Sequence, residues 1–343
     1  MKILLHSEHL DKIKKSGLGK SIQHQMRALE IAGIEFTTDS DDDFDLLHIN
    51  TYFPKSMLFA RKVREKGIPI VYHAHSTEED FRDSFRFSNQ IAPLFKQWLT
   101  QCYKLGDIII TPTTYSKKIL DTYELETDVI AISNGIDLER FTPIEHARDK
   151  FVQKYGYNED DFVVMAIGLY LKRKGILDFV ELAKRMPDVK FIWFGFTDLS
   201  LVPDEIEEAV ETKLPNLHFA GYVDNQDILL ALQGSDLYIF PTHEETEGIP
   251  AIEACASKAD FIVRDIPVFD DWLIDGETTY KAKDIDEFED KIRAFQNKEL
   301  PSLTEAAYQV ALDRDLPAIG EQLREVYERA YKLAKKRKIK ARI

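Results

Sequence analysis

Residues 236–256 read DLYIFPTHEETEGIPAIEACA. The apolar run 237–240 predicts a buried strand, and the later part of the stretch predicts a helix that continues through Cys255 and Ala256. Glu245 lies on the loop between them, and Glu253 lies eight residues later, inside the predicted helix. In open α/β sheets, ligands bind at the carboxyl ends of the strands. The stretch therefore predicts an α/β fold with two carboxylates near its ligand-binding edge.

The same alternation of short apolar runs and helical patterns extends along the chain. The strands are expected in two series, at 3–6, 46–49, 68–73, 107–111 and 129–132, and at 162–167, 190–194, 217–220, 237–240 and 261–263. Such alternation gives parallel sheets with helices on both faces. Two series predict two doubly wound domains, which we expect over 1–145 and 156–320.

Composition excludes several classes of protein. The chain has 343 residues and a net charge of −15, which argues against a nucleic-acid partner. No apolar run approaches the ~20 residues that span a bilayer, and the N-terminus is too short and polar for a signal peptide. The two cysteines, Cys102 and Cys255, suggest neither a disulfide framework nor a metal site. We therefore expect a cytoplasmic protein.

Two loops at strand ends carry ionisable side chains. The loop 168–175 contains Lys172, Arg173 and Lys174, and cations at such a place suit a diphosphate. At the end of the predicted strand 68–73, His73 and His75 are alternate residues, so both can face the same side. No nearby cluster of Cys, His and Asp completes a zinc shell, so no metal is expected.

Three motifs resemble those of retaining nucleotide-sugar glycosyltransferases with the GT-B fold. They are the E-x7-E pair, NGID at 134–137 followed by RF at 140–141, and KG at 174–175. The resemblance implies two Rossmann-like domains facing across a cleft, with a C-terminal helix, 321–343, crossing back to the first domain. It also implies a UDP-hexose donor substrate, with no cofactor and no metal.

The resemblance implies roles in the second domain. Lys174 would neutralise the leaving diphosphate, Glu245 would hold the transferred sugar, and Glu253 would accept hydrogen bonds from the ribose hydroxyls. Further donor contacts are implied for Tyr222 and for the backbone near Glu247, Gly248 and Ile249.

One position departs from the family pattern. Members usually carry an arginine directly after the first glycine of the loop, where this chain has Leu169. We expect Lys172 or Arg173 to supply the second charge, unless the site works with one cation fewer.

In the first domain, the resemblance implies that Gly17 and Gly19 lie on a loop under the donor phosphate and sugar. Their segment SGLGKS, 16–21, lacks the glycine at position 14 that a Walker A loop needs and the glycine at 22 that a dinucleotide fingerprint needs. His75 aligns best with the family's histidine beside the donor sugar and the acceptor hydroxyl, and His73 is the alternative.

The strings HSTEEDFR at 75–82 and HINTY at 48–52 are similar to those of a narrower group, the bacterial glycolipid synthases that add a second hexose to α-monoglucosyl-diacylglycerol. The group implies UDP-glucose or UDP-galactose as donor. Its product is a diglycosyl-diacylglycerol, a membrane lipid and a possible anchor for lipoteichoic acid.

Charge patterning fits a lipid acceptor. The chain ends in seven basic residues between Lys332 and Arg342 without an acid, and 53–66 is apolar and basic together. Such surfaces bind anionic membranes, so we expect a peripheral protein on the inner face of the cell membrane. A soluble or polysaccharide acceptor remains the alternative function, and a non-catalytic sugar-binding protein is a further one.

Overall fold

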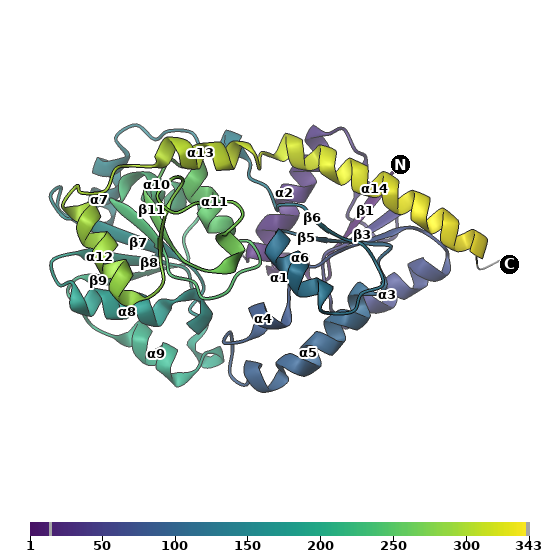
Figure 1. The fold of residues 1–343 in the computed structure, drawn as a ribbon, viewed down its shortest axis with the longest axis horizontal. Coiled ribbons are helices and arrows are strands. Elements are labelled where there is room, and N and C mark those ends of the chain that lie inside the picture. Colours follow the sequence, from purple (N-terminus) through teal and green to yellow (C-terminus); the bar gives the residue numbers. More distant parts are fainter. Residues whose placement is uncertain (14–15, 341–343) are drawn as a thin grey trace. The chain divides into compact units, whose positions relative to one another are not determined.

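The computed structural model describes residues 1–13 and 16–340, and the chain divides into two compact units. The first unit comprises Met1–Glu79, Ile91–Asp137 and the chain from Arg314 onward, and the second comprises Asp80–Gln90 and Leu138–Asp313. Each unit contains one six-stranded parallel sheet with helices on both faces (Figure 1). The architecture is therefore the α/β, doubly wound type that the alternating pattern predicts.

The sheet of the first unit has the order β2-β1-β3-β4-β5-β6. Its strands are β1 Ile3–His6, β2 Phe36–Thr37, β3 Leu46–Ile49, β4 Ile70–His73, β5 Ile108–Thr111 and β6 Val129–Ala131. One face packs against α2 (Gly17–Ile31) and α14 (Leu316–Lys340). The other face packs against α3 (Pro54–Glu65), α5 (Ser88–Tyr103) and α6 (Thr114–Asp121). The short helices are α1 (Leu10–Ile13) and α4 (Glu78–Phe81).

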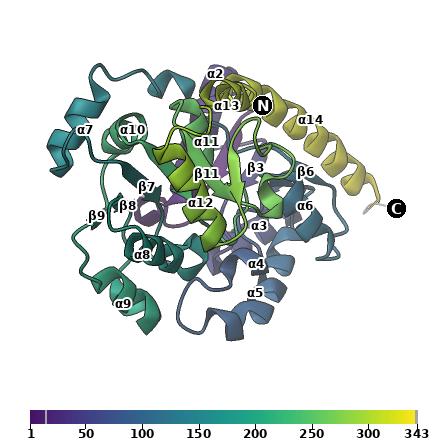
Figure 2. The same cartoon turned by 60° about the vertical axis from the view of Figure 1, so that its left-hand side comes forward.

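The sheet of the second unit has the order β12-β11-β10-β7-β8-β9. Its strands are β7 Val163–Ile167, β8 Lys190–Phe194, β9 Leu217–Gly221, β10 Leu237–Phe240, β11 Phe261–Arg264 and β12 Tyr280–Ala282. One face packs against α8 (Ile176–Arg185), α9 (Asp204–Glu211) and α12 (Ile285–Gln296), which Figure 2 shows from a second direction. The remaining helices are α7 (Ala147–Tyr155), α10 (Asn225–Gly234), α11 (Ile249–Ala256) and α13 (Thr304–Leu312).

The ten expected strands are all present, with ends within two residues of those expected. The sequence did not predict β2 and β12, because edge strands of two and three residues are too short to show a period. The units also differ from the expected domain bounds. Helix α7 belongs to the second unit because Arg148 donates to Gly234 O and pairs with Asp236, and 80–90 belongs there too.

Helix α14 completes the core of the first unit. Its apolar face, which includes Leu323 and Val326, packs with Ile3 and Leu5 of β1. The Tyr327 hydroxyl lies 2.7 Å from His48 Nδ1 on β3. The expectation that the C-terminal helix packs on the first domain is therefore confirmed, although the helix begins at Leu316, earlier than the expected 321.

Gly320 allows α14 to approach α2 closely. A Cβ atom at this position would lie 2.5 Å from Ala28 O and 2.8 Å from Ala32 Cβ. Real Cβ atoms do not approach a carbonyl oxygen so closely, so a larger residue must push the helices apart.

We expect Gly320→Ala to lower the free energy of unfolding by about 1–3 kcal/mol, the cost of overpacking. The matched control is Gly17→Ala in α2, where a Cβ would meet nothing within 4 Å. Glycine in a helix normally costs about 1 kcal/mol relative to alanine, so the control should be neutral or stabilising. Urea unfolding measures both, and a Gly320→Ala protein as stable as the control would contradict the close-packing account.

Candidate functional site

The loops after β7 and β10 meet at the carboxyl ends of these two neighbouring strands. The first loop ends at Gly175, which has a φ of +78°. A Cβ there would lie 2.2 Å from Pro241 O, so only glycine permits the contact. This contact explains the Lys174-Gly175 pair, because the glycine brings the preceding lysine against residues 242–245.

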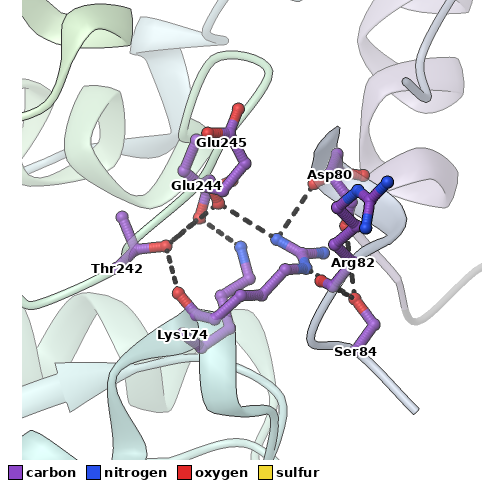
Figure 3. A network of polar contacts seen from close by, with 8 residues as sticks. Asp80, Arg82, Ser84, Lys174, Thr242, Glu244 and Glu245 are labelled. Atoms are coloured by element: carbon purple, nitrogen blue, oxygen red, sulfur yellow. Dashed lines mark hydrogen bonds and ion pairs between the residues drawn. The ribbon is translucent and has the colours of Figure 1, made fainter. Parts of the chain in front are cut away.

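Lys174 and Glu245 form a buried ion pair in the second unit (Figure 3). The lysine Nζ contacts Glu245 Oε1, and the two side chains are only 14% and 8% exposed. Thr242 Oγ1 donates to the same carboxylate oxygen at 3.0 Å. Burial lowers the pKa of Lys174, and the charge of Glu245 opposes that shift. The predicted diphosphate cation and the predicted sugar-binding carboxylate therefore lie in direct contact.

Arg173 connects the same loops to the segment 80–90. Its guanidinium lies 3.0 Å from Asp80 Oδ1, donates to Ser84 Oγ at 2.9 Å and donates to Glu244 O at 3.2 Å. Burial raises the pKa of Asp80, and the charge of Arg173 opposes that shift. These contacts explain why 80–90 belongs to the second unit.

The two candidates for the second cation are placed differently. The Arg173 side chain is 13% exposed and shares the loops with Lys174, whereas that of Lys172 is 47% exposed and pairs with Glu205 at 3.1 Å. Its burial and its position beside Lys174 therefore favour Arg173 over Lys172 as the second cation of the site. Leu169, which stands where the resemblance implies an arginine, is exposed.

All but one of the remaining predicted donor residues lie in α11 or directly before it. Glu253 lies in this helix and is buried, and Gly248, with a φ of +89°, precedes its first residue, Ile249. Burial, followed by the charges of Glu253 and Glu245, raises the pKa of Tyr238, which indicates that both carboxylates lie near this side chain. Two further residues were predicted: Glu247 is buried in the loop before the helix, and Tyr222 is exposed just after β9.

In the first unit, the prediction that Gly17 and Gly19 lie on a loop is wrong. Gly17 and Gly19 lie in the first turn of α2, and Ser16 is its N-cap, with Oγ accepting from Gly19 N at 3.2 Å. The serine supplies the acceptor that the first helical N–H groups need, so the helix begins earlier than expected.

His73 and His75 are stacked with ring centroids 3.9 Å apart. His73 is buried, and its Nδ1 lies 3.0 Å from Gln25 Nε2. His75 is partly exposed, its Nε2 lies 2.9 Å from Asn50 Oδ1, and its Nδ1 has no partner among the described residues. His73 Nε2 also has no hydrogen-bond partner among the described residues, but it is buried. Of the two candidates, His75 is therefore the one whose unpartnered ring nitrogen a substrate can reach.

Sequence reasoning missed Asn50 and Gln25. Asn50 directly follows the predicted strand 46–49 and lies within the HINTY string, so its position was a signal. Gln25 carries no signal, because a glutamine in a helix is ordinary.

Two features concern a metal and the membrane. Within residues 1–13 and 16–340, no group of three or more His, Cys, Asp or Glu side chains is arranged to hold a metal ion. In the same part of the chain, no helix has both the length and the apolar character required to cross a bilayer.

Comparison with known proteins gives consistent matches. Residues 147–310 match the family described as glycosyl transferases group 1, and residues 17–140 match glycosyltransferase family 4. A protein of Acholeplasma laidlawii named "Processive diacylglycerol alpha-glucosyltransferase" is 40% identical over 97% of this chain and 99% of its own length. The Streptococcus pneumoniae "Alpha-galactosylglucosyldiacylglycerol synthase" is 22% identical over 76% of this chain and 71% of its own.

Solved structures share the fold. Anabaena HepE in complex with UDP-glucose superposes with a TM-score of 0.76 at 17% identity, covering 96% of this chain and 99% of that one. The two parallel six-stranded sheets are those that the resemblance predicts. With a full-length relative at 40% identity, this chain belongs to the group 1 glycosyl transferases of the GT-B fold and is a glycosyltransferase.

Proposed function

We propose that this enzyme transfers glucose from UDP-glucose to a membrane glycolipid, monoglucosyl-diacylglycerol, with retention of the α configuration. The observation that carries the proposal is the full-length relative whose name specifies an alpha-glucosyltransferase for diacylglycerol. UDP-glucose is itself α-linked, so an α-glucoside product retains the configuration. Galactose is the second candidate, because a more distant relative is named for a galactosyl product.

The donor half of the reaction is assigned to the second unit. Cleavage of UDP-glucose leaves negative charge on the diphosphate, and Lys174 and Arg173 are the cations beside the carboxyl ends of β7 and β10. The diphosphate would compete with Glu245 for Lys174, which frees that carboxylate to accept hydrogen bonds from the sugar hydroxyls. Glu253 would hold the ribose.

We propose further that the reaction needs no metal ion. The two protein cations supply positive charge at the place where a metal ion does so in metal-dependent sugar transferases. The metal requirement can be tested separately. Chelation with EDTA should leave the rate of glucosyl transfer unchanged, and added Mn²⁺ should not raise it.

A basic surface on the first unit fits an anionic membrane. On α3, Lys55, Arg61 and Lys62 are exposed beside the exposed Leu58. On α14, Lys332, Lys335 and Lys336 are exposed. Each basic residue near such a membrane contributes about 1 kcal/mol, so these two groups together would bind the enzyme to its acceptor's bilayer.

The two helices that carry the basic groups come together at their carboxyl-terminal ends. Arg337 of α14 pairs with Asp107 before β5 and donates to Ile68 O, while Arg64 of α3 donates to Leu105 O at 2.6 Å. The carboxyl-terminal ends of α3 and α14 therefore both lie near the amino-terminal ends of β4 and β5. Of the remaining predicted basic tail, the side chains of Lys338 and Lys340 and the whole of Arg342 lie outside the described residues.

The direct test is transfer from radiolabelled UDP-glucose to vesicles that contain monoglucosyl-diacylglycerol. We expect a diglucosyl lipid, and Lys174→Ala should lose about 2–4 kcal/mol of transition-state stabilisation, the scale of one preorganised charge donor. The matched control is Lys172→Ala, which removes an exposed lysine two residues away and should keep the wild-type rate. A product formed only with UDP-galactose would show that the enzyme is a galactosyltransferase. A product formed only on a soluble glycan would show that the acceptor is not a lipid.

Substitution of each of the two glutamates should affect a different step, UDP binding for Glu253 and sugar transfer for Glu245. Glu253→Ala should weaken the binding of UDP by about 1–3 kcal/mol, because it removes the acceptor for the ribose hydroxyls. Glu245→Ala should leave UDP affinity within about twofold but impair turnover of UDP-glucose. Calorimetry with UDP measures the first effect. Unchanged UDP affinity in Glu253→Ala would show that the ribose assignment is wrong.

Membrane binding should depend on the two basic groups and on salt. We expect sedimentation with anionic vesicles to fall when Lys332, Lys335 and Lys336 are changed to glutamine, and to fade as salt shortens the Debye length from ~10 Å at ~0.1 M to ~3 Å at ~1 M. Changing three exposed lysines of the second unit is the control: Lys184, Lys213 and Lys298. Equal binding to neutral and anionic vesicles would instead favour a soluble acceptor.

A further inference from the structure

A buried polar network lies beside His75 in the first unit. It is built from Asn50 after β3, His73 on β4 and Gln25 on α2, all at most 3% exposed. Gln25 Nε2 lies 2.9 Å from Asn50 Oδ1 and 3.0 Å from His73 Nδ1. One amide nitrogen thus donates to both neighbours, and the network is fixed by contacts among three separate elements.

The network determines where the proton of His75 sits. Asn50 Oδ1 is an acceptor only, so the ring nitrogen 2.9 Å away, His75 Nε2, must carry a hydrogen. A neutral imidazole carries one ring hydrogen, so His75 Nδ1 is left as a bare acceptor. The same nitrogen has no partner among the described residues, as noted above.

The ring hydrogen of His73, the histidine stacked on His75, can also be placed from its contacts. Since Gln25 donates to His73 Nδ1, the hydrogen of His73 is on Nε2. His48 Nε2 lies 3.3 Å from the same His73 Nδ1, and His48 Nδ1 lies 2.7 Å from the Tyr327 hydroxyl of α14. The ring of His73 is therefore held in one neutral tautomer by Gln25.

The electrostatic surroundings keep His75 neutral. The titratable groups that act on it are the rings of His73 beside it on β4 and His48 from β3, while Asn50 and Gln25 are uncharged. Burial, with a further contribution from His48, lowers the pKa of His75 to about 3. The imidazole is therefore unprotonated at Nδ1 throughout the physiological range.

We propose that Asn50, oriented by Gln25, is a positioning residue that holds His75 in its Nε2–H tautomer, so that Nδ1 accepts a hydrogen bond from a hydroxyl of the bound substrate. Only the identity of that hydroxyl, on the glucosyl group or on the lipid acceptor, rests on the proposed function. The tautomer itself is a property of the substrate-free protein.

The first measurement is the tautomer of His75 in substrate-free enzyme, by NMR of protein with ¹⁵N-labelled histidine, with His75→Gln used to assign its signals. We expect wild-type His75 to carry its hydrogen on Nε2. Asn50→Asp keeps the acceptor oxygen and should keep this tautomer, whereas Asn50→Leu should give a mixture. If Asn50→Leu does not fold, Gln25→Leu makes the same test by releasing the Asn50 amide. Wild-type His75 with its hydrogen on Nδ1, the result of reversing both amides, would overturn the proposal.

The second measurement is the pH dependence of kcat. A carboxylate at position 50 should raise the pKa of His75 by about 1–3 units, so protonation removes the Nδ1 acceptor at a higher pH. The acid limb of kcat in Asn50→Asp should therefore move upward by about that amount, while the affinity for UDP stays unchanged. Asn50→Leu should lower kcat about 10- to 100-fold, the effect of losing one substrate hydrogen bond.

The matched control is Tyr72→Phe, which removes a buried hydrogen bond to Thr51 O in the same sheet without touching the network. It should change stability but neither the pH profile nor the tautomer. Wild-type kcat in Asn50→Leu, or an Asn50→Asp profile identical to wild type, would overturn the role of Asn50. Since the NMR arm uses no substrate, absence of glucosyl transfer to diacylglycerol lipids would count against the proposed acceptor alone.

Discussion

The contact between Gly175 and the carbonyl oxygen of Pro241 is the constraint on which the donor side depends. Because glycine has no side chain, the loops after β7 and β10 can come into contact here. This contact places Lys174 beside Glu245, where both side chains are buried. Removing two charges from water is costly unless they pair and hydrogen-bond, and Thr242 supplies an additional hydrogen bond to the carboxylate. The substrate-free site is therefore a compensated ion pair, not an open cation.

This compensation has a consequence for binding. The three cations of the loop, Lys172, Arg173 and Lys174, each pair with a carboxylate, those of Glu205, Asp80 and Glu245. A diphosphate that takes Lys174 replaces one anionic partner by another, so the lysine is never left buried and unpaired. The displaced carboxylate must find new donors at the same moment, and sugar hydroxyls are donors of the right kind. Under the proposed function, the same charges would pair with each other in the substrate-free protein and with the donor when it binds.

The sequence allowed the strands, the two-unit organisation and the placement of Glu245 and Glu253 to be predicted, because these depend on local period and on the order of elements. It did not allow the pairing of Lys174 with Glu245 to be predicted, since that contact joins residues 71 positions apart. Arg173 could not be separated from Lys172 for the same reason: burial distinguishes them, and burial is set by Asp80 and Ser84 from a distant segment. Asn50 and Gln25 likewise act only through the tertiary fold.

The two candidate sites hold their polar groups in different ways. In the second unit, Lys174 and Glu245 are charged and balance each other in a buried pair. In the first unit, burial keeps His48 and His75 neutral, with pKa values lowered to about 3. Hydrogen bonds, and not ion pairs, hold these two rings in place. This division suits glycosyl transfer, in which negative charge develops on the donor's diphosphate whereas hydroxyl groups are neutral hydrogen-bond donors. A protonated histidine could not accept from a hydroxyl, so the neutral state of His75 is a requirement for the acceptor role its geometry offers.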